Sequence, residues 1–463
     1  MPWTTLILLA IAEFMVILDV TVVNVALPSI GRSLHFGGGA LQWVVTAYVL
    51  FTGGLMLFGG RLADLAGRRR VFLAGLAVFT AASLGSGLAW SPAALIVTRA
   101  LQGAGAAMLL PSALSILTTT YAGPQRAKAL AIWGALGSAG AAAGVLFGGI
   151  LTQTLGWESV FFINVPVGVV LAAAALHLIP AAAPAHGQRE RLDVQGALTL
   201  MGGLVSLILA IEGTSSHGWG SAYTLGFAAL AAALIARFAR VERAVRRPLI
   251  APATWRNRPL VSSAAVMLTA TGILVGAFFL NSIYLQRVMG ASPIETGLAF
   301  LPLTLVILAG AHAAQSLLPR LGSRWTVVAG MLVAASGASL LAAAPAEPSY
   351  FANLLPGFLL LGLGIGATFV AVSVAAMADV DHESAGLASG LMTTAHELGA
   401  AVGVAVLAAI ASAATQGGAV ADVVSGYDTG FLVAGNVAAA VALVAALALP
   451  SVRPEPGMAH GMH

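Results

Sequence analysis

The stretch WTTLILLAIAEFMVILDVTVVNVALP, residues 3–28, decides the fold of this chain. A helix needs about 20 apolar residues to cross the hydrocarbon core of a bilayer, and this run is longer. Its charges are Glu13 and Asp19 alone, and an ionised carboxylate at such depth costs roughly 2.5–3.5 kcal/mol by insertion measurements. A simple anchor would carry leucine there. We predict that Asp19 binds a proton or a cation inside the membrane; the alternative is a hydrogen bond to a neighbouring helix.

The composition of the whole chain agrees with a membrane protein. Of its 463 residues, 59% are hydrophobic and 8% are charged, whereas soluble domains carry about 25% charged residues. The mean hydropathy is +0.95. The first apolar run is too long for a signal-peptide core, so we expect it to remain as the first helix. With no cysteine, the chain cannot form disulfides or thiolate metal sites, and we expect no metal and no cofactor.

Apolar runs of about 20 residues recur along the chain, and we count fourteen. They lie near residues 3–28, 40–60, 71–90, 93–119, 127–152, 160–179, 194–212, 221–238, 260–286, 294–318, 325–344, 351–377, 385–412 and 430–449. The runs 194–212 and 221–238 are the shortest and form a hairpin. We therefore predict an all-α polytopic membrane protein with 14 transmembrane helices.

The basic residues predict the orientation, because cytoplasmic loops collect lysine and arginine. With the N-terminus in the cytoplasm, eighteen of the 21 basic residues fall on the cytoplasmic side. These are Arg61, Arg68, Arg69, Arg70, Arg126, Lys128, Arg189, Arg191, Arg237, Arg240, Arg243, Arg246, Arg247, Arg256, Arg258, Arg320, Arg324 and Arg453. Arg32 and Arg287 are external, and Arg99 lies within a span. The net charge of +4 is thus explained by orientation, and we expect no nucleic-acid partner.

The runs divide the chain into two bundles. Residues 1–180 hold six helices, residues 181–258 hold linkers and a two-helix insert, residues 259–450 hold six more helices, and residues 451–463 form a tail. Two six-helix bundles are typical of a transporter that rocks one bundle against the other. Both termini are expected in the cytoplasm and the chain is expected to be a monomer.

The loop GRLADLAGRRR, residues 60–70, joins the second and third runs. Gly60 and Gly67 permit a tight turn, and Asp64 can pair with Arg68 and Arg69 or accept N–H bonds from the next helix. We predict a charge clasp that closes in one conformational state. The alternative is a solvated turn whose arginines only orient the chain.

This loop resembles the signature Gly-x-Leu-Ala-Asp-Arg-x-Gly-Arg-Lys/Arg of the major facilitator superfamily, with Leu65 in place of the usual basic residue. Four further blocks resemble its fourteen-helix drug:proton antiporter branch. They are LDVTVVNVALP at 18–28, RALQGAGAAMLLP at 99–111, FFINVPVG at 161–168 and YLQRVMGASPIETGL at 284–298. The resemblance implies the major facilitator fold and proton-coupled drug export.

The resemblance also implies roles for charged residues in the spans. Asp19 becomes the proton-coupling acid, and Arg99, which cannot lose its proton, tunes nearby carboxylates or polarises a proton path. The alternative is that Arg99 only donates hydrogen bonds to backbone carbonyls and so holds neighbouring helices together. Glu397 adds a titratable group where the branch often has glutamine, and we predict a second proton or cation site there. His396 can shuttle protons, although a lone histidine in an apolar helix is more often simply hydrogen-bonded.

Glycines at four-residue spacing, Gly140, Gly144 and Gly148, predict a ridge that lets another helix approach closely. The antiporters usually read Gly-Pro-x-x-Gly-Gly here, and Val145 stands at the proline position, which weakens the expected kink. The segment Trp157-Glu158-Ser159 likewise departs from the usual Trp-Arg-Trp.

A substrate cavity is expected between the bundles. Glu13 and Asn24 are eleven residues apart and share one helix face, whereas Asp19 lies about 120° away, so they need not reach the same cavity. The cavity candidates are Glu13, Asn24, Trp43, Tyr48, Gln102, Phe278, Tyr284 and His396.

We therefore expect a bacterial inner-membrane antiporter that exports hydrophobic or cationic small molecules in exchange for protons. The alternative is a proton-coupled importer of a nutrient or peptide, because the fold does not set direction. A membrane sensor is less favoured since no sizeable soluble domain is present. An enzyme is least favoured, because no phosphate-binding loop or nucleophile constellation appears.

Overall fold

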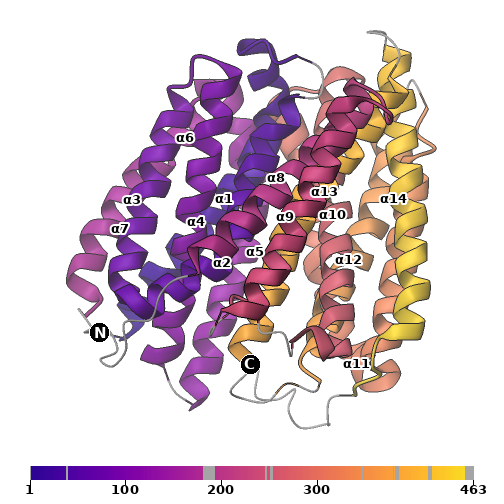
Figure 1. The fold of residues 1–463 in the computed structure, drawn as a ribbon. Helices are drawn as coiled ribbons and strands as arrows, with labels where there is room; N and C mark the ends of the chain where they lie inside the picture. The colour runs from indigo at the N-terminus through magenta and orange to yellow at the C-terminus, as the bar shows by residue number, and fades with distance from the viewer. Residues whose placement is uncertain are drawn as a thin grey trace.

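The computed structural model describes residues 2–37, 40–121, 123–180, 193–245, 248–250, 254–345, 348–378, 380, 385–415 and 420–453. In this part of the chain, thirteen helices are long and apolar enough to cross a membrane, and no strand occurs. The predicted all-helical polytopic fold is thereby confirmed (Figure 1). The first half comprises α1 (Pro2–Ser33), α2 (Trp43–Ala66), α3 (Arg68–Gly87), α4 (Pro92–Thr120), α5 (Gly123–Leu155), α6 (Ser159–Phe162) and α7 (Asn164–Leu178).

The rest of the chain contains seven further α-helices in the described residues. They are α8 (Val194–Ser216), α9 (Ala222–Ala244), α10 (Arg258–Arg287), α11 (Pro293–Leu341), α12 (Leu355–Ala376), α13 (Ala385–Ala414) and α14 (Val420–Ala448). Three short turns complete the described elements: η1 (Ala40–Gln42), η2 (Thr254–Arg256) and η3 (Tyr350–Leu354).

Helix α11 reconciles thirteen helices with fourteen predicted spans. Its backbone is non-helical at Gly322, with φ 76° and ψ 168°, so the chain turns there. Gly362 of α12 packs against Leu303, and Leu361 beside it packs against Gly337. Along a straight helix, Leu303 and Gly337 would lie about 50 Å apart, so α11 consists of two arms that run back past α12. These arms correspond to the predicted runs 294–318 and 325–344.

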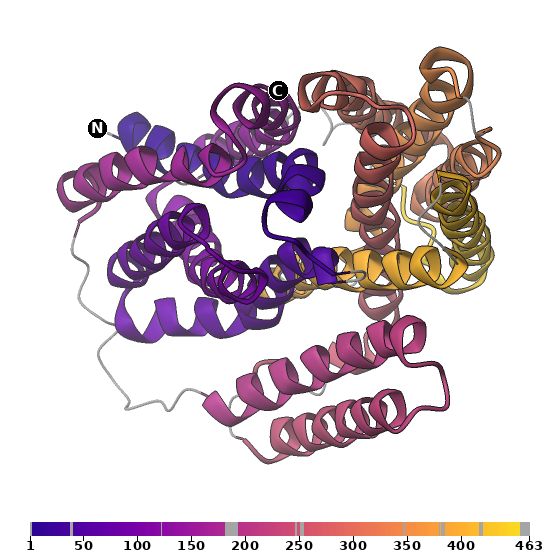
Figure 2. The same ribbon diagram turned by 90° about the horizontal axis from the view of Figure 1, so that it is seen from above.

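Two groups of helices stand side by side, with a helix pair outside them. Helices α1–α7 form one group and α10–α14 the other, and the view from above places α8 and α9 together beyond both (Figure 2). Helix α8 packs on α2 and α13. Met201 of α8, for example, fills the space in front of Gly54 of α2.

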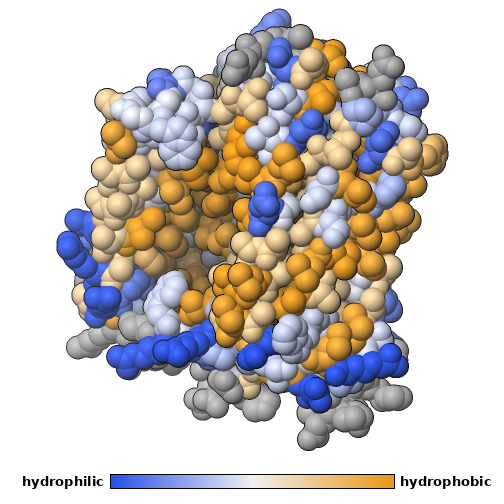
Figure 3. Space-filling view, turned by 90° about the vertical axis from the view of Figure 1, so that its right-hand side faces the viewer, coloured by the Kyte–Doolittle hydropathy of each residue, from blue (hydrophilic) through white to orange (hydrophobic). Residues whose placement is uncertain are grey.

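On the face shown in Figure 3, apolar side chains cover most of the middle, and hydrophilic side chains gather toward the two ends. We call the end where α1 begins and α14 finishes the arginine-rich face, and the other end the opposite face. The described basic residues at the arginine-rich face are Arg61, Arg68, Arg69, Arg70, Arg126, Lys128, Arg237, Arg240, Arg243, Arg256, Arg258, Arg320, Arg324 and Arg453. Arg189, Arg191, Arg246 and Arg247 lie outside the described residues.

Two expected loops are largely helical. Helix α2 continues to Ala66 and α3 starts at Arg68, so the turn between them is Gly67 alone, with φ 95°. Such a positive φ suits glycine, which lacks the Cβ that would clash. Helix α9 runs to Ala244, so Arg237, Arg240 and Arg243 lie on its last turns rather than in a linker. The helix thus continues past the predicted apolar run 221–238.

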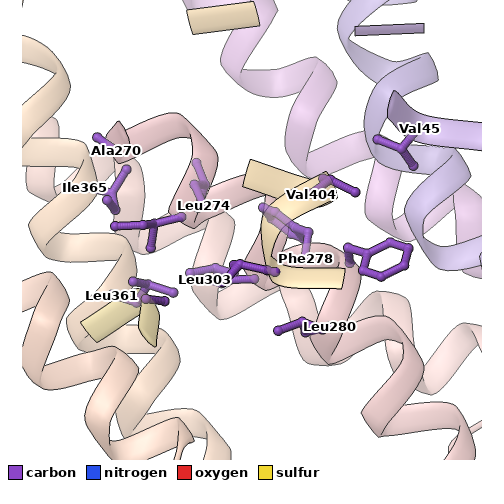
Figure 4. Close-up of a cluster of buried hydrophobic side chains, with 14 of the residues drawn as sticks. Val45, Ala270, Leu274, Phe278, Leu280, Leu303, Leu361, Ile365 and Val404 are labelled. Atoms are coloured by element: carbon purple, nitrogen blue, oxygen red, sulfur yellow. The ribbon is translucent and has the colours of Figure 1, made fainter. Parts of the chain in front are cut away.

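A large apolar core joins the two groups of helices. It extends from Val45 of α2 to Phe278 of α10 and Val404 of α13. Figure 4 shows part of this core, including Phe278 and Leu280. Between helices that span a bilayer, such side chains stabilise the contact mainly by van der Waals packing, because lipid tails are as apolar as they are.

Candidate functional site

Asp19 is completely buried inside the first group of helices and accepts hydrogen bonds from three side chains. Arg99 Nη1 lies 2.5 Å from Oδ2, Gln102 Nε2 lies 2.8 Å from Oδ1, and Asn164 Nδ2 lies 2.7 Å from Oδ1. These donors come from α4 and α7, so the carboxylate links α1 to two other helices. Charge-assisted bonds of this length are the strong class of protein hydrogen bond. Both carboxyl oxygens of Asp19 thus act as hydrogen-bond acceptors for neighbouring helices.

Arg99 is equally buried and has partners of both predicted kinds. Its guanidinium forms the one ion pair among the described residues, with Asp19, and its Nε donates to the carbonyl oxygen of Val44 at 3.0 Å. The ring of Tyr48 lies beneath it, with the guanidinium carbon 4.2 Å from the ring centroid. The cation is therefore stabilised by a carboxylate, a carbonyl and an aromatic face together.

Two residues of this network were not predicted as site residues. Asn164 donates to Asp19 and also to Ser83 Oγ at 3.0 Å, and Ser83 donates to the carbonyl of Phe161. Asn164 lies in the quoted block FFINVPVG and is its one polar side chain, a signal that was available in the sequence. Ser83 carries no comparable signal, because serines in spans commonly bond to their own helix.

A cavity of about 350 Å³ lies between the two groups of helices; we call it the central cavity. It falls in the size range of small-molecule sites, about 300–1,000 Å³. Its wall is mostly apolar. The polar lining residues are Glu13, Thr21, Asn24, Thr271, Thr304, His396 and Glu397, with the aromatic rings of Phe278 and Phe369 beside them.

The polar wall of the central cavity is rich in unused acceptors. Glu13 accepts a hydrogen bond from the Trp133 indole, but its Oε2 is buried and has no partner among the described residues. The same holds for Asn24 Oδ1, whose amide nitrogen donates to Val20 O. Buried acceptors without donors are costly, so this wall is suited to a ligand that carries N–H or O–H donors or positive charge.

The second group of helices contributes a further carboxylate and a histidine. Glu397 and His396 of α13 line the cavity opposite Glu13, and His396 Nδ1 lies 3.0 Å from Thr271 Oγ1. His396 is therefore hydrogen-bonded, which is the more common role of a lone histidine in an apolar helix. His312, in contrast, is exposed and contacts its own helix at Leu308 O.

Asp19 does not line the central cavity, in agreement with its 120° offset from Glu13. Tyr48 is buried and stacks under Arg99, while the next residue of α2, Val49, lines the central cavity. The buried pair and the cavity are therefore neighbouring but separate sites.

Four expected cavity residues lie elsewhere in the structure. Tyr48 and Gln102 belong to the surroundings of Asp19 and Arg99, as described above. Trp43 lies at the opposite face, where its Nε1 donates to Glu212 Oε2 at 2.7 Å, and Tyr284 lies at that face as well. Residue type alone did not reveal which neighbour each side chain meets. Phe278 is a lining residue, as expected.

The expected charge clasp is not formed among the described residues. Asp64 is exposed in the last turn of α2 and forms no ion pair with any described arginine, and the start of α3 has no side-chain cap. Arg69 instead donates to the carbonyl of Leu176 at 2.7 Å, which links α3 to α7. Gly60 packs near Pro111 of α4, and Arg68 has no described carboxylate partner.

The glycine ridge of α5 lies directly against α1. A Cβ at Gly140 would come within 2.9 Å of Phe14 O, and one at Gly148 would come within 2.8 Å of Val22 O. Gly144, between them, faces Leu18 O at 2.8 Å. The three glycines thus match three α1 residues that are also four apart, and α1 is held close to α5 along the segment that carries Asp19.

The two groups of helices are sealed at the opposite face. Ser282 of α10 donates to Asn24 O at 2.5 Å, and Gln286 donates to Val25 O at 2.9 Å. Helix α5 meets α11 at Gly149 and Pro293, and Gln153 accepts from the backbone N–H of Ile294. Nearer the arginine-rich face, a Cβ at Gly134 of α5 would meet nothing within 4 Å. The central cavity therefore lies on the arginine-rich side of the seal.

Comparison with known proteins gives the family. A model described as Major Facilitator Superfamily matches residues 9–404. The chain is 40% identical to the puromycin resistance protein pur8 of Streptomyces alboniger, over 87% of this chain and 80% of the relative. It is 39% identical to a cephamycin export protein of Amycolatopsis lactamdurans, over 86% of this chain and 83% of the relative.

A solved structure shares the fold. A bacterial homologue of the human lysosomal transporter Spinster, crystallised in an inward-facing and unoccupied conformation, aligns with a TM-score of 0.67 over 98% of this chain and 99% of its own, at 18% identity. Together with the two six-helix groups and the cavity between them, these matches are decisive. The chain belongs to the major facilitator superfamily and is a multi-pass membrane transporter of small molecules.

Proposed function

We propose that this protein exports hydrophobic, cationic small molecules across a bacterial cytoplasmic membrane in exchange for protons. The observation that carries the proposal is the central cavity, whose apolar wall holds two carboxylates and the unpartnered acceptors of Glu13 and Asn24. Such a wall favours a ligand with an apolar body and a protonated amine. The resistance and export names of the two bacterial relatives support export rather than import.

In this mechanism the two buried sites have separate roles. Glu13 and Glu397 contact the cationic substrate, and Asp19 accepts the proton. In its ionised form Asp19 binds Arg99, Gln102 and Asn164; protonation removes the negative charge that holds Arg99 in place. Because these partners lie on α4 and α7, loss of the charge loosens α1 relative to its neighbours. Helix α1 also carries Asn24 and Val25, whose carbonyls form the seal to α10.

Proton movement supplies the energy. One charge moving down a potential of 100 mV releases about 2.3 kcal/mol, before any pH gradient is added. The arginine-rich face is cytoplasmic in this proposal, with both termini on that side, as the distribution of basic residues favours. The conformation described above then opens toward the cytoplasm. We expect the protein to work as a monomer with the lipid bilayer as its surroundings.

Reconstituted vesicles test the proposal directly. The purified protein is placed in liposomes with ethidium on the side of the arginine-rich face. The solution on the other side of the membrane is then made more acidic. We expect ethidium to move against protons and the movement to stop when an uncoupler is added. Accumulation in the direction of the proton flux would instead identify an importer, and movement unaffected by the uncoupler would exclude proton coupling.

A further inference from the structure

A second cavity, about 540 Å³ in volume, opens at the opposite face; we call it the outer cavity. Its lining comes from both groups of helices and from the two-helix insert. Glu212, Ser215 and Ser216 belong to α8, Gln42 precedes α2, and Tyr284 belongs to α10. The insert thus contributes side chains to a cavity that neither group of helices forms alone.

Buried apolar residues separate the outer cavity from the central cavity. Phe278 lines the central cavity, whereas the next two residues of α10, Phe279 and Leu280, line the outer one. The bond from Ser282 to Asn24 O closes the same layer. In this conformation a molecule in the outer cavity is therefore distinct from one in the central cavity.

Several of the hydroxyl groups that line the outer cavity already donate to groups of the protein. The hydroxyl groups of Ser215 and Ser216 donate to the carbonyl of Glu212, and that of Tyr284 donates to Pro345 O. Tyr427, whose ring stacks on Tyr284 with centroids 4.1 Å apart, donates to Asn281 Oδ1. These rings therefore present apolar surface to the cavity rather than free hydroxyl groups.

The acceptors of the outer cavity are not fully occupied. Gln42 is 1% exposed, lines the cavity, and its Oε1 has no partner among the described residues. The Glu212 carboxylate accepts one bond, from the Trp43 indole, and a carboxylate has about four acceptor positions. Arg287 also lines the cavity, but it is exposed, so water and salt screen its charge. The cavity thus offers a buried acceptor without a partner at Gln42 and a partly buried carboxylate with free acceptor positions at Glu212.

We propose that the outer cavity is a second binding site for an organic cation with N–H donors on an aromatic body. The amine contacts Glu212 and Gln42, and the aromatic body packs on the Tyr284–Tyr427 pair. The site is separate from the central one and gives the two-helix insert a role in ligand binding. This proposal rests on the proposed function only for the direction in which a bound cation would be transported. Its test measures binding alone.

Equilibrium binding of ethidium, which carries a positive charge and two aryl amines, tests this site. The full chain in lipid nanodiscs is titrated and the number of dye molecules per chain is determined. We expect two for the wild type. Glu212→Gln, which keeps an acceptor for Trp43, and Gln42→Leu are each expected to weaken one of the two binding events by about tenfold and to leave the other unchanged.

Matched variants assign the two events. The double variant E13Q/E397Q is expected to weaken only the event that survives Glu212→Gln. Glu158→Gln removes a charge from the same face but from neither cavity, and should change neither event. One dye per wild-type chain, or two events that are both insensitive to Glu212→Gln and Gln42→Leu in variants with unchanged thermal unfolding, would overturn the proposal. A failure of proton-driven efflux would leave this binding result intact, so the two proposals fail separately.

Discussion

Among single residues, the Asp19–Arg99 pair carries the largest energetic consequence. Both side chains are almost fully buried, and breaking a buried pair by removing one partner costs about 3–5 kcal/mol, because the other charge stays behind. The pair is thus stable only while Asp19 is ionised or while something else compensates Arg99. In the proposed mechanism, this dependence couples the charge of Asp19 to the packing of α1.

The first prediction follows from that dependence. Asp19→Asn removes the charge but keeps the shape, so we expect it to lower stability by about 3–5 kcal/mol and to abolish proton-driven ethidium efflux. The double variant D19N/R99Q removes both charges and should recover much of the stability without recovering coupling. Thermal unfolding and proteoliposome efflux measure the two effects. Efflux that still follows the pH gradient in Asp19→Asn would contradict the assigned role.

The second prediction concerns the cavity carboxylates. Glu13→Gln and Glu397→Gln should each weaken the export of ethidium, a cation, by about tenfold in apparent KM, because a charge-assisted contact is lost. Export of chloramphenicol, a neutral compound, should change less than twofold where it is a substrate. Glu158→Gln, outside both cavities, is the control. Equal losses for the neutral compound would show that these residues act on the cycle rather than on substrate charge.

The residues that sequence could identify were those whose chemistry is unusual for a membrane. Asp19, Arg99 and Glu397 are each expensive in lipid, and that expense predicts function without a structure. Asn164 is a polar residue in a span and could have been singled out, but its contact with Asp19, like that of Tyr48 with Arg99, depends on residues that are distant in the chain. Trp43 and Tyr284 were predicted to line the cavity because they are aromatic. An aromatic residue can occupy any depth of the membrane, so its type did not reveal that both lie at the opposite face.

On the scale of helices, close approach explains how α1 is positioned. The ridge of α5 was predictable because glycine at every fourth residue lies on one face, but its partner helix was not. The turn at Gly322 shows the reverse case. Two spans were predicted here because the sequence holds two apolar runs of about one bilayer thickness, 294–318 and 325–344, and the turn at Gly322 lies between them.

The third prediction tests the α1–α5 contact. Gly144→Val places a branched side chain against Leu18 O, so we expect a loss of about 1–3 kcal/mol in stability and reduced efflux. Gly226→Val on α9 is the matched control, because a Cβ there meets nothing within 4 Å. Thermal unfolding of the two variants makes the comparison. Equal unfolding temperatures would mean that α1 and α5 can separate without cost.

At the scale of the whole molecule, the arrangement implies that the two groups of helices part at the opposite face during transport. That face is now sealed by contacts of α1 with α10 and of α5 with α11, while the central cavity lies below the seal. A cation in the central cavity can reach the other side only if these contacts open. Rocking of the groups, rather than movement of one side chain, is the motion that breaks both contacts at once.

The fourth prediction uses the absence of cysteine from the sequence, which makes introduced thiols specific. Cysteines at Gln153 and Ile294, on α5 and α11, joined by a short cleavable thiol reagent, should hold the seal closed and reduce efflux more than tenfold. Cleavage of the reagent should restore it. The control pair is Ser86 and Thr98, whose hydroxyl oxygens lie 3.0 Å apart within the first group of helices. Because this pair joins α3 to α4 and does not cross the seal, the control cross-link should leave efflux within twofold. Full activity of the cross-linked 153–294 pair would show that the substrate leaves by another route.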